Sequence, residues 1–574
     1  MRKSSVIVPA ALLGAALVWS GSAAAAEPES AWNDESSWDI PGEYVVDFAD
    51  DVEPGVIARA LSGLGLTGKP TALFDETRIE IVKVPSGLRG VLDKLRGISD
   101  VEGIEPHAQV RAFFVPDDPM YEKQWHMTRV GAESAWGLSV GRGVTVAVVD
   151  TGIACENFEQ FTKASDLLQT RCVDGWSFVS KTAHANDDQG HGTHVAGTIA
   201  QSTNNGIGGA GLAFGARLMP VKVLSADGYG TTTAVADGIR WAADHGAQVI
   251  NLSLGGPRNS RVLQKAVDHA RSRGAIIVAA AGNSGGSVGY PGASDGVIGV
   301  SATDQNDALA AFSSRGPGVD IGAPGVSVTQ QTICDRGKNR CEIFPAWNGT
   351  SMASPHVAGA AALLVGLGVN DADAVEAILK DSAKVLDDSE SGKHKFGAGL
   401  LQAQAAAAEV FQTQLMARLL ALLGMALVAF RWARRRGETV ALSSPGFWIG
   451  ATAVGAGIGF FAPFFLSRHE LWVDLVIRPL AEWDLVLVGA GFHRFLPLAN
   501  ALVPLALVAV FNSVRGAGPW LAGLCVGTAG YLASVMVLGQ MATPFGSVLT
   551  SLWCGVNAMI CVYLASLLLK KNAS

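Results

Sequence analysis

The sequence predicts a mainly parallel α/β domain, preceded by a small α+β domain and followed by an all-α bundle of transmembrane helices. Three observations support this fold class. In the middle of the chain, fully apolar strand-like runs alternate with helical patterns rich in small residues, which is typical of a parallel sheet covered on both faces. Before them, shorter strand and helix patterns alternate. After Phe411, long apolar runs follow one another with few charges, as membrane spans do.

Composition supports a membrane protein and argues against a nucleic-acid-binding one. The 574 residues are 49% hydrophobic and only 16% charged, and the mean hydropathy is +0.28. Ordinary soluble proteins are less apolar. Since the formal net charge is -8 and the middle domain has no basic stripe, we expect no nucleic-acid partner.

Residues 1–26 have the layout of a secretory signal peptide. Arg2 and Lys3 precede an apolar run from Val6 to Trp19, and small residues continue through Ala26. An uncleaved anchor is the alternative, but the apolar run is short for a membrane span. Under either interpretation, the middle domain is exported.

A serine lies between a glycine turn and an apolar helical pattern within residues 348–364. Glycine allows the turn, and the helix N-terminus favours developing negative charge. Pro355 is expected near the helix start, where its missing N–H would be unpaired anyway. Because this arrangement exposes a hydroxyl, Ser351 is the candidate nucleophile.

A serine nucleophile needs a base and a third group that orients the base. His191 begins a second small-residue helical pattern and is the candidate general base. Asp150 ends a buried strand-like run that starts at Gly143, at the edge where open α/β sheets place their active sites. It is the candidate orienting carboxylate.

These three segments, in the order Asp, His, Ser, resemble the subtilisin-like serine protease family. A fourth segment fits the same family, because the apolar run Ala275–Ala281 leads to Asn283, which the resemblance makes the oxyanion donor. The similarity runs from about Asp117 to Ala405, and we assign residues 116–406 to the peptidase domain. It implies a serine endopeptidase that needs no metal for its chemistry.

The resemblance also implies where a polypeptide substrate binds. Two backbone edges are expected to pair with an extended peptide by strand addition; they contain Gly228, Tyr229, Gly230, Ser253, Leu254 and Gly255. The P1 pocket is bordered by small, uncharged residues, namely Ala280, Ala281, Gly282, Ser284 and Gly289. Without a carboxylate among them we expect an aromatic or aliphatic P1 residue. Asp187 and Asp188 could still favour a basic residue at a neighbouring subsite.

Members of the family build an oxygen-rich structural calcium site. The corresponding positions here are Gln124, Glu159, Thr203, Asn205, Ile207 and Gly209. Glu159 stands where the family usually has aspartate, and its extra methylene is expected to shift or weaken coordination. A Gly/Asn-rich turn without calcium is the alternative interpretation.

Residues 27–115 resemble the inhibitory propeptide of the family, with an inhibitor-like α+β pattern from about residue 42. Strand-like runs cover Glu43–Phe48 and Arg78–Val84, and a helical pattern covers Gly87–Ile98. The resemblance implies that this domain inhibits the enzyme until autocatalytic cleavage between Ala112 and Pro116. A permanent accessory domain is the alternative.

Cysteine usage fits export to an oxidising compartment. Two locally spaced pairs predict the disulfides Cys155–Cys172 and Cys334–Cys341, although four cysteines allow three connectivities and buried free thiols are an alternative. Cys525, Cys554 and Cys561 lie in apolar segments and are expected to be unpaired.

Residues 411–574 form the predicted membrane module. Five apolar runs are each long enough to span a bilayer as a helix: 413–431, 446–466, 496–514, 519–538 and 548–569. Export of the peptidase domain sends the first span inward, and the basic segment Arg431–Arg436 that follows is typical of a cytoplasmic loop. We expect a multi-pass cell-membrane protein whose peptidase domain is extracytoplasmic and whose C-terminus is cytoplasmic.

Residues 471–492, between the second and third spans, place Asp474, Arg478 and Glu482 four apart on one helix face. An interfacial amphipathic helix is the first interpretation, and a sixth span is the alternative. Almost no linker separates the peptidase domain from the first span, so we expect the protease to lie close to the bilayer and to cut membrane-associated substrates.

The chain is therefore predicted to be a membrane-anchored, exported serine endopeptidase. Two other classes compete with this prediction. One is a catalytically silent membrane receptor or assembly factor that binds peptides in a protease-like shell. The other makes the membrane module a transporter or signalling element whose ligand the protease processes.

Overall fold

The computed structural model describes residues 39–71, 73–84, 90–108, 114–334, 343–436, 444–457, 470–493, 501–514, 516–539 and 546–569. The chain divides into two units, one up to Arg111 and one from Ala112 onward. The predicted signal peptide and the first residues of the predicted processing segment lie outside the described residues.

The first unit is a small α+β domain. Its antiparallel sheet has the strand order β2-β3-β1-β4. One side chain from each of two helices, Ile57 and Leu95, is fully buried with Val46 and Val82 of the sheet. The elements are β1 (Asp39–Phe48), α1 (Pro54–Gly63), β2 (Gly68–Pro70), α2 (Phe74–Thr77), β3 (Ile79–Lys83), α3 (Gly90–Arg96) and β4 (Val101–Ala108).

The second unit is built on a parallel sheet with the order β12-β11-β10-β9-β5-β8-β6, to which β7 adds beside β8. Every residue of β5 and β10 is buried, which explains why both strands consist of apolar runs. The strands are β5 (Thr145–Asp150), β6 (Arg171–Cys172), β7 (Trp176–Ser177), β8 (Arg217–Lys222), β9 (Val249–Leu252), β10 (Ile276–Ala280), β11 (Ile298–Thr303) and β12 (Ile321–Pro324). A separate hairpin pairs β13 (Val328–Thr329) with β14 (Ala346–Trp347).

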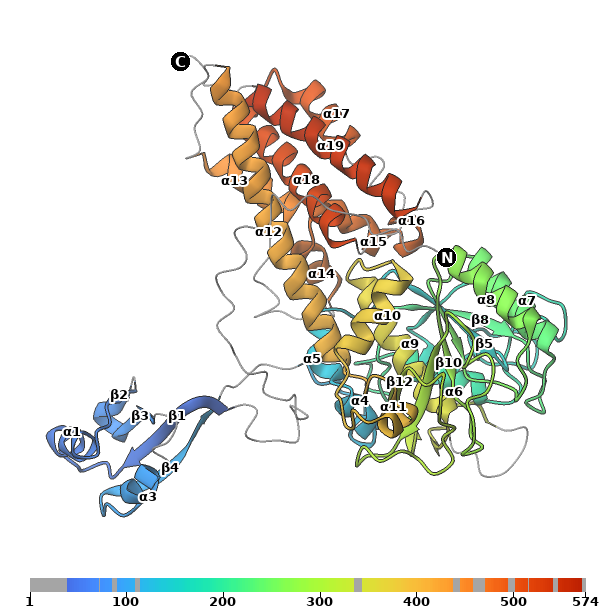
Figure 1. The fold of residues 1–574 in the computed structure, drawn as a ribbon, viewed down its shortest axis with the longest axis horizontal. Helices are drawn as coiled ribbons and strands as arrows, with labels where there is room; N and C mark the ends of the chain where they lie inside the picture. The colour runs from blue at the N-terminus through green and yellow to red at the C-terminus, as the bar shows by residue number, and fades with distance from the viewer. Residues whose placement is uncertain are drawn as a thin grey trace. The chain divides into compact units, whose positions relative to one another are not determined.

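Helices cover both faces of this sheet (Figure 1). Val146 and Val148 of β5 pack with α6 and α9 on one face, while Ala147 and Val149 pack with α7 and α8 on the other. This alternation follows the two-residue period of a strand. The helices are α4 (Trp125–Arg129), α5 (Ala132–Trp136), α6 (His191–Ala200), α7 (Thr232–Asp244), α8 (Arg261–Ser272), α9 (Thr350–Gly366), α10 (Ala372–Asp381) and α11 (Glu390–Phe396), with 3-10 turns η2 (Tyr121–Lys123) and η3 (Ser165–Leu167).

A helical region continues from the sheet domain. Helix α12 (Ala403–Arg435) begins in the core of the sheet domain, where Ala403 and Ala406 are buried, and runs on for 33 residues. It packs in a second core with α13 (Pro445–Gly455), α17 (Leu502–Phe511), α18 (Gly518–Leu538) and α19 (Ser547–Leu568).

Three helices of the described residues are long and apolar enough to cross a membrane: Ala403–Arg435, Gly518–Leu538 and Val548–Leu568. They coincide with the predicted first, fourth and fifth spans. The predicted second and third spans contain the shorter helices α13 and α17, and parts of both spans lie outside the described residues. The number of five spans therefore stays a prediction.

Residues 470–493 do not form the single amphipathic helix predicted from the sequence. The chain there forms α14 (Leu471–Ile477), the 3-10 turn η5 (Leu480–Glu482), α15 (Trp483–Leu487) and α16 (Ala490–His493). Pro479 interrupts the helix because it has no N–H and holds Arg478 in an extended conformation. The prediction of an interfacial amphipathic helix is wrong, since Asp474, Arg478 and Glu482 of its charged face are only 1%, 2% and 3% exposed.

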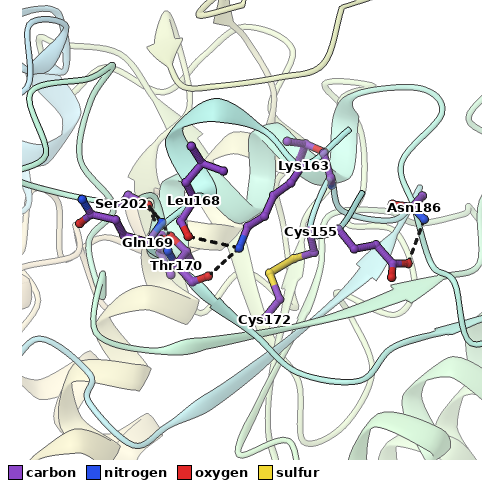
Figure 2. Close-up of a disulfide and its surroundings, with 12 residues drawn as sticks. Cys155, Lys163, Leu168, Gln169, Thr170, Cys172, Asn186 and Ser202 are labelled. Atoms are coloured by element: carbon purple, nitrogen blue, oxygen red, sulfur yellow. Dashed lines mark hydrogen bonds between the residues drawn. A yellow bond between two sulfur atoms is a disulfide. The ribbon is translucent and has the colours of Figure 1, made fainter. Parts of the chain in front are cut away.

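The predicted disulfide Cys155–Cys172 is present (Figure 2). Within the loop it closes, Lys163 donates hydrogen bonds to the carbonyl oxygens of Leu168 and Thr170 at 3.4 and 3.2 Å. Cys334 is also disulfide-bonded, while its predicted partner Cys341 lies outside the described residues. The other three cysteines are free and buried, as predicted: Cys525, Cys554 and Cys561.

Candidate active site

Asp150 and His191 meet at the carboxyl edge of the parallel sheet. Asp150 is the last residue of β5, and His191 is the first residue of α6. His191 Nδ1 lies 2.7 Å from Asp150 Oδ1. The carboxylate is fully buried and also accepts a hydrogen bond from the backbone N–H of Thr151 at 2.7 Å. Asp150 therefore fixes the proton on Nδ1 and leaves Nε2 of His191 to act as a base.

The same contact sets the basicity of the imidazole. Burial lowers the pKa of His191, but the charge of Asp150 and its hydrogen bond to the ring together outweigh burial. The more distant carboxylate of Asp187 acts in the same direction, and the net pKa of His191 is raised. A raised pKa makes the ring a stronger proton acceptor and stabilises the imidazolium that forms when it accepts one.

Ser351 is the second residue of α9, at the end of the helix that lies in the site. Its hydroxyl donates a hydrogen bond to the backbone carbonyl of Ser253 at 3.0 Å. The hydroxyl has to turn from this carbonyl to His191 before it can give up its proton. Catalytic hydrogen bonds often form only when substrate is bound.

Pro355 occupies a different position in α9 from the one expected. It is the sixth residue of the helix, so an N–H there would bond to the Ser351 carbonyl four residues earlier. The expectation that this N–H would be unpaired anyway is wrong. The Ser253 hydroxyl takes its place and donates to the Ser351 carbonyl at 2.8 Å. Proline thus frees the carbonyl of the nucleophile for a bond from the segment after β9.

Asn283, which follows β10, is held by the residue before the nucleophile. Thr350 donates to Asn283 Oδ1 from its backbone N–H and from its hydroxyl, both at 2.9 Å. Thr350 Oγ1 in turn accepts the backbone N–H of Gly282 at 3.1 Å. Because the amide oxygen is occupied in this way, the Nδ2 donor of Asn283 is left beside Gly349, at the N-terminus of α9.

Two carboxylates near His191, those of Asp187 and Asp188, already have partners within the protein. Asp187 is only 2% exposed. It accepts five hydrogen bonds of 2.6 to 3.0 Å, from Thr151 Oγ1, from the backbone N–H groups of Gln189, Gly190 and Thr193, and from Thr193 Oγ1. Asp188 pairs at 2.6 Å with Lys222, whose side chain is 5% exposed. Both carboxylates are therefore engaged within the protein, and a basic substrate residue at a neighbouring subsite stays an alternative.

An open groove of about 580 Å³ lies beside His191. Both predicted backbone edges border it, with Gly228, Tyr229, Gly230, Ser253, Leu254 and Gly255. Apolar surface comes from Leu224, Val235 and Leu263. The groove therefore brings together two segments that are about 25 residues apart in sequence, as strand addition of an extended peptide requires.

The residues predicted to border the P1 pocket lie at the end of β10 and in the loop after it. The backbone N–H of Gly289 donates to the Ala281 carbonyl at 2.9 Å, which closes this loop. Paired hydrogen bonds of 2.8 Å between Gly256 and Tyr290 then join the loop to the second edge of the groove. These hydrogen bonds connect the end of β10, the loop after it and the segment after β9.

The predicted calcium ligands are only partly brought together. The Gln124 amide is used by the backbone of Ala210 and Thr329, at 2.6 to 3.1 Å. Glu159 is exposed on a turn, where it has a positive φ of 52°. One side chain is thus hydrogen-bonded to the backbone and the other faces solvent, and the calcium site stays a prediction.

Asp118 and Asp166 reach the Thr203–Gly209 loop instead. Asp118 accepts the backbone N–H groups of Asn204 and Asn205 at 2.7 and 3.0 Å, and Asp166 accepts Asn205 Nδ2 at 2.8 Å. Burial raises the pKa of Asp166 to about 7, and the neighbouring charge of Asp118 adds to the rise. Within the described ranges, no group of three or more His, Cys, Asp or Glu residues could hold a metal ion.

A parallel sheet with Asp, His and Ser at its carboxyl edge, and an anchored amide beside the serine, defines a serine hydrolase of α/β type. Residues 141–399 match the model of the Subtilase family. A thermophilic serine proteinase of Bacillus sp. (strain AK1) is 37% identical over 349 residues, which cover 60% of this chain and 83% of that protein. Subtilisin Savinase of Lederbergia lenta is 44% identical over 49% of this chain and 97% of its own length. Thermitase of Thermoactinomyces vulgaris is 40% identical over 47% of this chain and 92% of its own length. The chain belongs to the subtilase family and is a subtilisin-like serine endopeptidase.

Sequence reasoning missed several residues that position this site. Asp187 is expected from the sequence only near a substrate subsite, whereas the structure places it at the start of α6, where it accepts hydrogen bonds from Gly190 and Thr193. Thr350 directly precedes the nucleophile, but nothing local indicates that its partner is Asn283. Asp118 and Asp166 are isolated in sequence from the loop they contact, so no local pattern could have found them.

Proposed function

We propose that this chain is a membrane-anchored, exported serine endopeptidase with Asp150, His191 and Ser351 as its triad and Asn283 as the oxyanion donor. The observation that carries the proposal is the 2.7 Å hydrogen bond between His191 and the buried Asp150, at the head of the groove. The family membership adds support, because the motifs around all four residues belong to the matched region.

The chemistry is acyl transfer in two halves. His191 Nε2 takes the Ser351 proton as Oγ attacks the peptide carbonyl, and Asp150 stabilises the imidazolium. The oxyanion accepts a hydrogen bond from Asn283 Nδ2, and the N-terminus of α9 adds a favourable dipole. His191 then protonates the leaving amine. Water repeats the sequence on the acyl-enzyme and releases the new carboxyl end.

Substrate recognition is proposed to rest on backbone pairing and on an apolar P1 pocket. Pairing to the two edges of the groove gives affinity with little side-chain selectivity. Ala280, Ala281 and Gly282 provide no carboxylate that could neutralise a buried basic P1 residue. A panel of peptides that differ only at P1 should show preference for aromatic or aliphatic residues, and a strong preference for Arg would refute this part.

The first unit is proposed to be the propeptide that inhibits the enzyme before export is complete. Its support is the small antiparallel α+β fold and its separation from the second unit at Arg111, close to the proposed processing segment. A broad protease that is inactive until exported does not damage its own cell. Permanent retention of residues 27–115 on the mature enzyme would make this unit an accessory domain instead.

Membrane anchoring by the helical region is proposed from its composition. Three helices have the length and hydropathy of spans. Helices α13 and α18 approach closely through small residues, since a Cβ at Gly523 would collide with the Phe447 carbonyl, and tight contacts of this kind are common between membrane helices. With the basic residues at the end of α12 inside, the protease domain is extracytoplasmic and the C-terminus cytoplasmic.

A structural calcium ion at the Thr203–Gly209 loop is part of the proposal. Asp118, Asp166 and Asn205 would hold it, together with loop carbonyls such as those of Thr203, Ile207 and Gly209. Carboxylate and carbonyl oxygens are the ligands that a hard cation prefers, and the side chains of Asp118 and Asp166 are buried at this loop. The ion would stabilise the fold and take no part in peptide hydrolysis.

Electrophoresis of the membrane-expressed wild type beside Ser351→Ala, with a fluorophosphonate probe for active serine hydrolases, tests the proposal. Only the wild type should react with the probe and lose residues 27–115. If neither protein reacts or shortens, the enzyme proposal fails and the peptide-binding receptor becomes the better interpretation. A wild type that reacts with the probe but does not shorten would support the enzyme proposal and refute the propeptide proposal.

A further inference from the structure

The helical region contacts the sheet domain at the edge opposite the active site. The backbone N–H of Ala490 donates to the Gly143 carbonyl at 2.9 Å, just before β5 begins. Arg217, the first residue of β8, donates to the Val488 carbonyl at 3.0 Å. The backbones touch here, since a Cβ at Gly143 would overlap the Leu485 carbonyl. The active-site carboxylate lies at the other end of β5.

The carboxyl end of α9 makes the second part of this contact. Gln414 of α12 donates to the Leu367 carbonyl at 3.0 Å, and the Arg478 guanidinium donates to the Gly366 carbonyl. These carbonyls are among those that a helix end leaves without internal partners. The helix therefore has the nucleophile at one end and the helical region at the other.

Two independent counts give the separation between the active site and this contact. From Ser351 to Gly366, the rise of 1.5 Å per residue in α9 gives roughly 22 Å. From Gly143 to Asp150, the rise of a parallel strand gives about 23 Å. The two elements run in opposite directions between the same two edges, because Gly366 at the end of α9 lies against Gly141, just before β5.

Buried ion pairs fix the contact. Arg478 pairs with Asp474 at 2.8 Å and lies 3.6 Å from Glu482. Glu482 also pairs with Arg418 of α12, and Arg142, just before β5, lies 3.5 Å from Asp474. These five residues form what we call the junction cluster. Removing one member leaves a buried charge without its partner, which is destabilising. The cluster therefore favours one arrangement of the helical region on the sheet domain over a loose connection.

The junction segment also takes part in both apolar cores. Leu485 and Ala490 are 1% and 3% exposed within the core of the sheet domain. Ala481 packs against the core of the helical region. The contact between the two regions is therefore continuous apolar packing around a charged centre, as within a single domain.

We propose that the active site is held at a fixed height, facing away from the bilayer, and that the enzyme cuts segments lying well outside the membrane. The inference rests on the proposed membrane anchoring. Helix α12 reaches the carboxyl end of α9 at Gln414, which lies at the beginning of the predicted first span, and Ser351 lies roughly 22 Å from that end along the axis of α9.

A substrate is cleaved only if its scissile bond can extend from the membrane as far as the active site. An extended chain covers at most about 3.3 Å per residue, so a scissile bond within about seven residues of a substrate's own membrane span cannot enter the groove. The substrates are therefore exported soluble polypeptides, or membrane proteins with a longer flexible stem. The expectation of membrane-associated substrates, drawn from the short connection to the first span, is thereby narrowed to those with such a stem.

Energy transfer measures the height directly. The full-length protein, in nanodiscs whose lipids carry an acceptor dye, reacts at Ser351 with a fluorophosphonate that carries the donor dye. We expect transfer that corresponds to roughly 22 Å or more above the lipid surface, and a height below about 10 Å would overturn the inference. The labelling step is read separately: a protein that does not react refutes the proposed function, and the inference with it.

The dependence of cleavage on stem length is measured with reporter substrates that each have a single membrane span. The same apolar cleavage sequence is placed about 3, 7, 12 and 20 residues from the reporter's span, and the free peptide serves as the activity control. We expect at least tenfold faster cleavage of the two long-stemmed reporters than of the shortest one. Equal rates for all four, with the free peptide cleaved normally, would refute selection by height.

Glu482→Gln tests the junction cluster, because it keeps the shape of the side chain and removes one buried charge. We expect a broader distribution of heights and faster cleavage of the shortest reporter, with the free-peptide rate unchanged. Arg142→Gln, at the edge of the cluster, is the second variant if Glu482→Gln does not fold. Heights and reporter rates identical to wild type in the folded variant would refute the fixing role of the cluster.

Discussion

Removal of the Thr350 hydroxyl should weaken transition-state stabilisation without touching the triad. Asn283 Oδ1 accepts two hydrogen bonds of 2.9 Å, both from Thr350, and the hydroxyl supplies one of them. In Thr350→Ala the amide is held by the backbone N–H alone and can rotate away from the oxyanion. Thr350 is therefore a positioning residue that acts through Asn283.

The size of the effect follows from the bonds that are lost. Thr350→Ala removes the bond to Asn283 and leaves the Gly282 N–H without its 3.1 Å acceptor. A neutral hydrogen bond is worth about 0.5–1.5 kcal/mol net. One such loss expressed in the transition state lowers kcat by up to about tenfold. Deleting the donor itself should cost more, since loss of the oxyanion asparagine in a subtilisin lowers turnover by about 10²–10³.

Steady-state kinetics on a chromogenic peptide separate this role from a structural one. Thr350→Ala should lower kcat with KM nearly unchanged, and Thr350→Ser should restore most of the rate because it keeps the hydroxyl. In an Asn283→Ala background the same substitution should have little further effect. Additive losses in the double variant, or a serine variant as slow as the alanine one, would refute the reasoning.

Three further predictions concern the base, the fold and the calcium loop. The hydrolysis rate should fall as the pH decreases through the raised pKa of His191, because only the neutral ring accepts the Ser351 proton; a rate that stays flat down to about pH 4 would exclude this base. Asp187→Ala should lower the free energy of unfolding by about 3 kcal/mol in denaturant titrations, since three backbone N–H groups lose their acceptor; a change smaller than that of an exposed-site control such as Asp227→Ala would contradict the assignment. Calcium at 100 times its Kd should stabilise the wild type by about 2.7 kcal/mol against thermal inactivation and leave Asp166→Asn almost unaffected, whereas equal responses of both proteins to a chelator would place the ion elsewhere.

The parts of the fold next to the triad could be predicted because each has a strong local pattern. The unbroken apolar runs of β5 and β10 predict strands covered on both faces, and the structure has them as central strands of a parallel sheet. The starts of α6 and α9 follow from glycine before a small-residue helix. The order of Asp, His and Ser, together with the family resemblance, predicts that Asp150 and His191 are partners although they are 41 residues apart in sequence.

What could not be predicted depends on contacts between distant segments. The spacing of Asp474, Arg478 and Glu482 places them on one side of a helix, but it does not say whether that side meets water or protein. The partner of the Ser351 carbonyl is a hydroxyl nearly 100 residues away, and the mid-helix proline is the only local sign that a partner is needed. Glu159 matched a family position, yet the local turn directs it outward.

The core of the sheet domain includes residues that are synthesised well after the nucleophile. Ala403 and Ala406 of α12, and then Leu485 and Ala490, complete the apolar core that surrounds the nucleophile helix. On a growing chain, these last two residues emerge more than a hundred positions after Ser351, once the first predicted spans have left the ribosome. The core around α9 is therefore completed by residues of the helical region that are synthesised after the rest of the protease domain.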